Sequence, residues 1–146
     1  MSERSEKAYQ LFKEGYNCSQ AVLAVFANDL GMDFETAMKL SSSFGGGMGK
    51  LREVCGAVSA MFMVAGLKNG YTSPKAVTEK NDHYALIQKL AKDYEAENGS
   101  INCGELLGLK EKRQPPVAEL RTEEYYKKRP CAELVKSAVE ILEKNL

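Results

Sequence analysis

A glycine-rich stretch that leads to a cysteine constrains this chain more than any other feature. Four of the five residues from 45 to 49 are glycine, and Cys55 then opens an almost wholly apolar segment that ends at Leu67. Glycine permits backbone conformations and close approaches that a Cβ atom forbids. We therefore expect another helix or a small ligand to lie tightly against this loop. The candidate ligand-binding residues are Gly45, Gly46, Gly47 and Gly49.

The length and charge of the chain limit its class. One domain spanning residues 1–146 is the simplest interpretation, since a chain of 146 residues can bury a single core. Twenty basic and twenty acidic residues cancel, so no positive field attracts phosphate backbones, and general nucleic-acid binding is not expected. The sequence shows neither an apolar run of membrane-spanning length nor the apolar stretch of a signal peptide. We therefore expect a cytoplasmic protein without membrane insertion.

Apolar residues recur at helical spacing along the chain, and no segment shows the alternation typical of a β-strand. The sequence predicts an all-α fold, a compact bundle of about five to six helices. Helices are expected at residues 2–13, from 17 or 19 to 30, and at 33–40, 54–67, 74–97 and 131–142, with one helical turn at 102–108. The segment 110–119 contains two prolines and should be an exposed connection. The helices that begin near Cys18 and Cys55 are the most apolar, so they should form the buried centre. The short turn and the last helix should bring Cys103 and Cys131 to the same end.

The four cysteines share one kind of position, at or near the predicted N-terminus of a helix. That end of a helix presents unpaired N–H groups and about half a positive charge, which stabilise a thiolate. The pKa of such a cysteine can fall from about 8.5 toward 3.5–7.5. Lys50, Arg52 and Arg129 lie nearby in the sequence and would add to this effect. The candidate redox-active residues are Cys18, Cys55, Cys103 and Cys131.

Cysteine spacing leaves several interpretations open. The chain has no Cys-x-x-Cys motif, so neither a thioredoxin-type site nor a zinc knuckle is indicated. The four thiols could form exchangeable disulfides in any of three pairings, with Cys55 as the expected attacking thiolate because it combines a helix N-terminus with a flexible glycine approach. The same four thiolates could instead hold zinc or an iron–sulfur cluster. Buried cysteines can also be unreactive packing residues in a structural helical module.

Three stretches carry a resemblance to a known family. They are Gly15-Tyr16-Asn17-Cys18-Ser19-Gln20-Ala21-Val22, Cys55-Gly56-Ala57-Val58-Ser59-Ala60, and the single Cys103 and Cys131. In the order and placement of these cysteines the chain resembles the redox-active family named for its C_GCAxxG_C_C pattern. The resemblance covers nearly the whole chain and implies a small redox protein with four characteristic cysteines. Ala60 departs from the family's CGAxxG motif, which has a glycine there, and adds one methyl group to a helix face.

Other groups indicate no second chemistry. His83 is the only histidine, and a packed or solvated side chain is the favoured interpretation over a metal ligand. The glycine-rich stretch is not a phosphate-binding loop of the Walker type, because Phe44 and Leu51 replace its first glycine and its final hydroxyl residue. The basic run at 127–129 is expected to be a solvated approach to the last helix. The sequence specifies no redox partner, and it is compatible with a homodimer.

Overall fold

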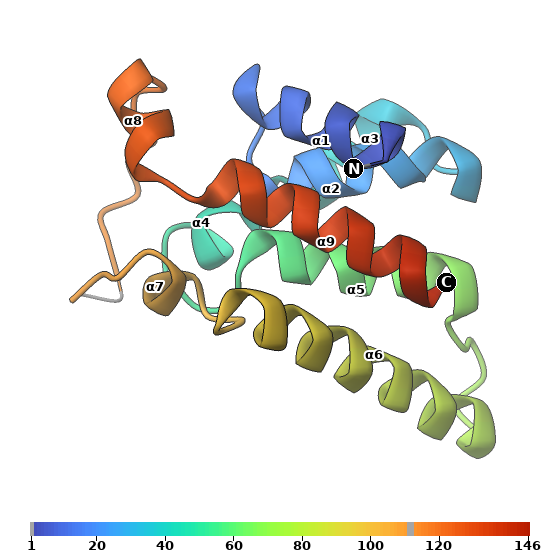
Figure 1. Ribbon diagram of the computed structural model, residues 1–146. Helices are drawn as coiled ribbons and strands as arrows, with labels where there is room; N and C mark the ends of the chain where they lie inside the picture. The colour runs from blue at the N-terminus through green and yellow to red at the C-terminus, as the bar shows by residue number, and fades with distance from the viewer. Residues whose placement is uncertain (1, 111–112) are drawn as a thin grey trace.

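A computed structural model describes residues 2–110 and 113–146, and within them the chain is helical (Figure 1). The all-α class is confirmed, and the β-pairing found in these residues is one isolated bridge between Val54 and Asn102. The elements in chain order are α1 (Glu3–Lys13), α2 (Cys18–Ala27), the 3-10 turn η1 (Asn28–Leu30), α3 (Phe34–Ser42), α4 (Gly45–Met48), α5 (Gly56–Asn69), α6 (Val77–Asn98), α7 (Cys103–Leu106), α8 (Glu123–Lys128) and α9 (Cys131–Asn145).

The described residues form more helices than the five to six predicted. The six helices of nine residues or more, which are α1, α2, α3, α5, α6 and α9, correspond to the six that were expected. The short elements α4, α7 and α8 bring the number above that prediction. The six-residue helix α8 was missed because it is too short for a periodic apolar pattern.

Most helix starts follow their capping residues. The side chain of Asn17 accepts a hydrogen bond from the backbone N–H of Gln20, and Asp33 caps α3 in the same way. The start of α6 was predicted too early, at Pro74. Ser73 closes a turn there instead, accepting from the backbone N–H of Lys75 at 3.2 Å, and the helix begins at Val77.

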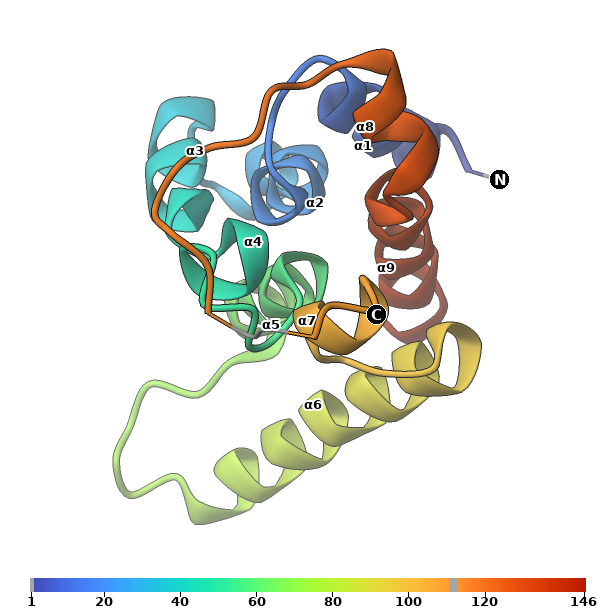
Figure 2. The same cartoon turned by 90° about the vertical axis from the view of Figure 1, so that its left-hand side faces the viewer.

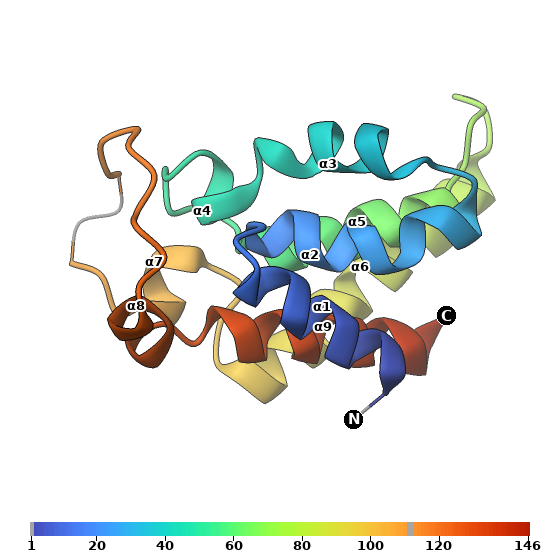
Figure 3. The ribbon, with the colours of Figure 1, turned by 90° about the horizontal axis from the view of Figure 1, so that it is seen from above.

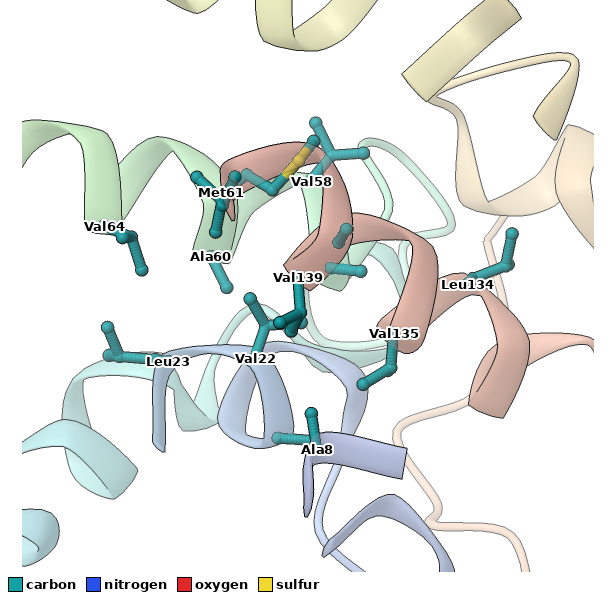
Figure 4. Close-up of a cluster of buried hydrophobic side chains, with 14 of the residues drawn as sticks. Ala8, Val22, Leu23, Val58, Ala60, Met61, Val64, Leu134, Val135 and Val139 are labelled. Carbon is teal, nitrogen blue, oxygen red and sulfur yellow. The ribbon is translucent and has the colours of Figure 1, made fainter. Parts of the chain in front are cut away.

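The core lies between α2, α5 and α9, with α1 packed across α2 and α9 (Figure 4). Val22 of α2, Val58 and Met61 of α5, and Val139 of α9 are all completely buried. Each such side chain contributes about 1.5–3 kcal/mol to stability. The prediction that the helices of Cys18 and Cys55 form the buried centre is therefore confirmed. Ala60 is also fully buried there.

The N-termini of α2, α5 and α9 gather at one end of the bundle, where α4, α7 and α8 also lie (Figure 2). Seen from above, α2, α5 and α9 all run from this end of the bundle toward the other end (Figure 3). The irregular segment of residues 113–122, called the connecting segment below, passes over this end on its way to α8 (Figure 2). Among the helices that the structure describes, none has an apolar stretch long enough to span a membrane.

Candidate functional site

All four cysteines line one cavity of about 60 Å³ at this end of the bundle. Cys18, Cys103 and Cys131 are the first residues of α2, α7 and α9, and Cys55 is the N-cap of α5. Their expected placement at helix N-termini is thus confirmed. All four are free thiols, three of them buried, while Cys18 is partly exposed. A cavity of this size has room for roughly four water molecules.

A short antiparallel pairing joins two of these cysteines. The backbone N–H of Cys55 donates to the carbonyl of Ile101 at 2.8 Å, and the N–H of Cys103 donates to the carbonyl of Glu53 at 2.6 Å. These bonds tie the start of α5 to the start of α7. Two residues that lie far apart in the sequence are therefore held beside each other by backbone contacts.

The glycine-rich stretch packs directly against the cysteines. Gly47 has a φ of +66°, and a Cβ atom there would lie 2.5 Å from the Cβ of Cys103 and 2.7 Å from the Cα of Arg52. Gly56 also allows a close approach, because its Cβ would lie 2.9 Å from the carbonyl oxygen of Phe44 and 3.3 Å from the Cβ of Cys18. The tight contact expected for this stretch is therefore to the chain itself. Gly46 and Gly47 line the cysteine cavity, and Gly45 lines a neighbouring cavity, whereas Gly49 lines neither.

Three residues beside these glycines also have left-handed backbone conformations: Met48, Lys50 and Arg52 have φ values of 71°, 69° and 57°. Each such conformation costs about 1–2 kcal/mol for a residue with a Cβ. The loop therefore persists only because surrounding contacts hold it. Some of these contacts come from the buried guanidinium of Arg52. It donates to the sulfur of Cys103 at 3.4 Å and to Gln114 Oε1 at 2.9 and 2.7 Å.

Cys131 and Cys18 form a pair with opposite pKa shifts. A hydrogen bond from Cys18 lowers the pKa of the Cys131 thiol, burial opposes this, and the positive charge of Arg129 lowers it further. Arg52 and Arg121 act in the same direction. The pKa of Cys18 is raised well above its ordinary value by its hydrogen bond to Cys131 and by burial. The pair therefore favours a thiolate on Cys131 and a thiol on Cys18.

The other two cysteines remain protonated at neutral pH. Burial raises the pKa of Cys55 to about 11, although the hydroxyl of Tyr94, 3.4 Å from its sulfur, partly offsets this. Burial also raises the pKa of Cys103, and the hydrogen bond from Arg52 opposes the shift. The low pKa expected for Cys55 is therefore wrong. Loss of hydration at this buried sulfur outweighs the favourable helix N-terminus.

The cysteine cluster does not fit a metal centre. Within residues 2–110 and 113–146, no three histidine, cysteine, aspartate or glutamate side chains lie close enough together to hold a metal ion. The arrangement of the four sulfur atoms thus gives no support to the zinc or iron–sulfur alternative that the sequence left open. His83 lies away from the cavity on α6, where its ring packs edge-on against Tyr71 with the ring centres 6.1 Å apart.

Sequence reasoning found part of the cationic lining of the cavity. Arg129 was expected to stabilise a thiolate, and it lowers the pKa of Cys131. The basic run 127–129 was also expected to be solvated, but the guanidinium of Arg129 makes two hydrogen bonds to Glu119, at 2.8 and 2.9 Å. Arg121 carried no sequence signal, and it donates to the backbone carbonyls of Phe12 and Tyr16 at 2.9 and 3.1 Å. The only clue to Arg129 was its place two residues before Cys131.

The fold and the site define a small all-helical protein with four thiols around one cationic cavity. The chain belongs to the family described as "Putative redox-active protein (C_GCAxxG_C_C)", whose model matches residues 16–145. The matched range contains all four cysteines, and the resemblance noted from the sequence is confirmed. Searches of curated proteins and of solved structures found no match.

Proposed function

We propose that this protein performs dithiol–disulfide exchange, with Cys131 as the attacking thiolate and Cys18 as the resolving thiol. The observation that carries the proposal is that Cys18 and Cys131 line one shared cavity, where Cys18 and nearby arginines lower the pKa of Cys131 alone among the four cysteines. A thiolate is the nucleophile in disulfide exchange, so a lowered pKa favours reactivity. The start of α9, a helix of 15 residues, adds its positive end to the stabilisation of the anion.

The first step is attack of the Cys131 thiolate on one sulfur of a disulfide substrate. A Cys131–substrate bond forms, the substrate S–S bond breaks, and one substrate thiolate leaves. Cys131 then no longer carries a negative charge, so the principal cause of the high pKa of Cys18 disappears. Cys18 gives up its proton to the departing thiolate and attacks Cys131. The protein disulfide forms and the second substrate sulfur leaves as a thiolate, which takes a proton from water. Two electrons have then passed from protein to substrate.

The remaining cysteines are assigned a supporting role in this scheme. Cys55 and Cys103 stay protonated and line the same cavity as the reactive anion. We propose the cytoplasm as the place of action, because its reducing poise regenerates the dithiol. The redox partner that returns the two electrons is a cytoplasmic dithiol or a small thiol in this proposal.

Thiol counting and disulfide mapping test the proposal. The reduced protein is treated with bis(hydroxyethyl) disulfide, and free thiols are counted before, after, and after re-reduction. We expect the reversible loss of two thiols and a Cys18–Cys131 peptide cross-link by mass spectrometry. Cys18→Ser should trap the substrate as a mixed disulfide on Cys131, while Cys131→Ser should abolish the reaction. Cys55→Ser is the matched control and should keep the same cross-link.

Two other outcomes would replace the proposal. Four thiols that resist oxidation under all these conditions would indicate a structural helical module with unreactive cysteines. Stoichiometric zinc, or iron with visible absorption bands, in protein purified without oxygen would favour the metal-binding alternative.

A further inference from the structure

A second, more open cavity of about 340 Å³ lies directly outside the cysteine cavity. Its wall is formed by the glycine-rich stretch on one side and by the connecting segment 113–122 on the other. Five residues line both cavities, so the outer one leads to the sulfur atoms. They are Asn17, Gly46, Arg52, Arg121 and Tyr125.

Positive charge surrounds the passage between the two cavities. Lys50 lines the outer cavity, Arg129 lines the inner one, and Arg52 and Arg121 line both. Among the described residues, the carboxylate that forms ion pairs with this cluster is Glu119. One carboxylate does not neutralise four cations, so the passage retains a positive field.

Three cations, Lys50, Arg52 and Arg129, surround the carboxylate of Glu119, and this group is called the carboxylate seat below. The carboxylate accepts two hydrogen bonds from Arg129, and its Oε1 atom lies 3.6 Å from Nη2 of Arg52 and 3.8 Å from Nζ of Lys50. Both bonds come from Nη2 of Arg129, one to each carboxylate oxygen, and hydrogen bonds between two charged groups are about twice as strong as bonds between neutral ones. Glu119 comes from a segment without helix or strand, and its neighbour Leu120 is 84% exposed. The side chain can therefore leave the seat without disturbing the core.

We propose that this seat binds the carboxylate of a small-molecule disulfide, and that Glu119 occupies it when no substrate is bound. This inference rests on the proposed function and names its substrate class. Arg129 connects the two sites because it holds the carboxylate of Glu119 and also lines the cavity of the four cysteines. A carboxylate bound in the outer cavity leaves the thin S–S portion of the molecule directed into the inner one. There the Cys131 thiolate attacks and a carboxylate-bearing thiolate leaves, as in the exchange described above.

A charge series of substrates tests the inference on the unaltered protein. The reduced protein is oxidised by dithiodipropionate, which is anionic, by bis(hydroxyethyl) disulfide, which is neutral, and by cystamine, which is cationic. Each rate is divided by the rate at which the same disulfide reacts with free mercaptoethanol, so that intrinsic reactivity cancels. We expect the anionic disulfide to react about tenfold faster than the cationic one, because a cleft of one charge sign raises association rates by 10 or more. The advantage should shrink as salt is added.

A non-reactive competitor separates binding from chemistry. Suberate is a dicarboxylate of the same chain length as dithiodipropionate but has no sulfur. We expect suberate to slow oxidation by dithiodipropionate and to leave oxidation by the neutral disulfide unchanged.

Variants test the roles of Glu119 and of the seat. Glu119→Gln removes the competing charge and should raise the normalised rate with dithiodipropionate by about threefold, whereas Lys50→Gln should lower it. The matched controls are Glu35→Gln and Lys39→Gln, which break an exposed ion pair of 3.4 Å on α3 and should change nothing. If either site variant loses its helical circular dichroism, the substrate series and the suberate competition still decide.

The outcomes distinguish the inference from the proposed function. Equal normalised rates for the three disulfides, or faster reaction of cystamine, would overturn the inference and leave dithiol–disulfide exchange intact. A slower anionic reaction in Glu119→Gln, or no effect of suberate, would also overturn the carboxylate seat. Failure of all three disulfides to oxidise the protein would overturn both.

Discussion

At the scale of single residues, four cysteines in one cavity have different acidities because their immediate neighbours differ. Cys18 and the charges of nearby arginines lower the pKa of Cys131. Cys55 lies deeper, has a neutral tyrosine hydroxyl as its partner, and has a pKa of about 11. A helix N-terminus is common to both, so it does not decide which cysteine ionises. Burial dominates at Cys55, whereas at Cys131 the influence of Cys18 and of the nearby arginine charges outweighs burial.

Arg129→Gln should raise the pKa of Cys131. The substitution removes a cation that lowers this pKa, and it leaves the carboxylate of Glu119 without its hydrogen-bonded partner. Both changes disfavour the thiolate, so we expect the midpoint of Cys131 alkylation by iodoacetamide to move up by about one pH unit. Mass spectrometry of the Cys131 peptide after short pulses at different pH values measures the shift.

Lys128→Gln is the matched control for this prediction. It removes the same charge one residue away, but the side chain of Lys128 is 73% exposed and pairs with Glu124. We expect no measurable shift of the Cys131 midpoint, because solvent screens an exposed charge. An equal shift in both variants would show that overall charge, rather than the geometry of Arg129, controls this cysteine.

At the scale of elements, the loop between α3 and α5 combines close packing with backbone strain. Gly47 fills a position where a side chain has no room, and Arg52 is held in a left-handed conformation two residues before Val54 begins the pairing with Asn102. The loop therefore fixes both the Arg52 guanidinium and the start of α5. A small change in this loop reaches two of the four cysteines.

Gly47→Ala should destabilise the protein by about 2–4 kcal/mol, from the left-handed backbone and from the overlap with Cys103 and Arg52. Gly66→Ala is the matched control. It lies within α5, where an added Cβ meets no atom within 4 Å, and should stabilise by about 0.5–1 kcal/mol. Urea unfolding followed by circular dichroism measures both free energies. If Gly47→Ala and Gly66→Ala changed the free energy of unfolding by the same amount, the close packing around Gly47 would be contradicted.

The sequence was sufficient for features that depend on neighbouring residues. Asn17 and Asp33 predict where α2 and α3 begin, because the side chain of an N-cap residue bonds to a backbone N–H only three residues away. The placement of the cysteines at helix starts followed from the same local logic. The sequence also predicted that Cys103 and Cys131 lie at the same end as Cys18 and Cys55. Whether all four sulfur atoms meet within one chain could not be derived, because it depends on how whole helices pack. The role of Arg121 could not be predicted for a related reason. Its hydrogen-bond acceptors lie in α1 and in the turn after α1, far from it in the sequence.

At the scale of the whole molecule, the core and the thiol site are parts of one structure. Helices α2, α5 and α9 share a core, and each carries or is capped by a cysteine at the same end. The packing that stabilises the fold therefore also fixes the sulfur positions. Burying thiols in this way has an electrostatic consequence, because it couples the stability of the fold to their protonation.

Alkaline pH should destabilise the folded protein through Cys55. Its thiol ionises near its ordinary pKa in the unfolded chain but only at about 11 in the folded one. Between these values the folded state retains a proton that the unfolded state has lost, so stability is fully present below the lower pKa and falls as the pH rises. We expect wild-type protein to lose about 2 kcal/mol more than Cys55→Ser between about pH 8 and about pH 10.5.

Urea unfolding at the two pH values measures this difference, and other titrating groups cancel because both proteins contain them. Ser59→Ala is a useful reference, since Ser59 is a buried, non-titrating residue on the same helix, and its pH dependence should match the wild type. If Cys55→Ser loses as much stability as the wild type, the Cys55 thiol must ionise equally easily in both states. Its sulfur would then be hydrated in the folded protein, and the cavity would admit water as far as α5.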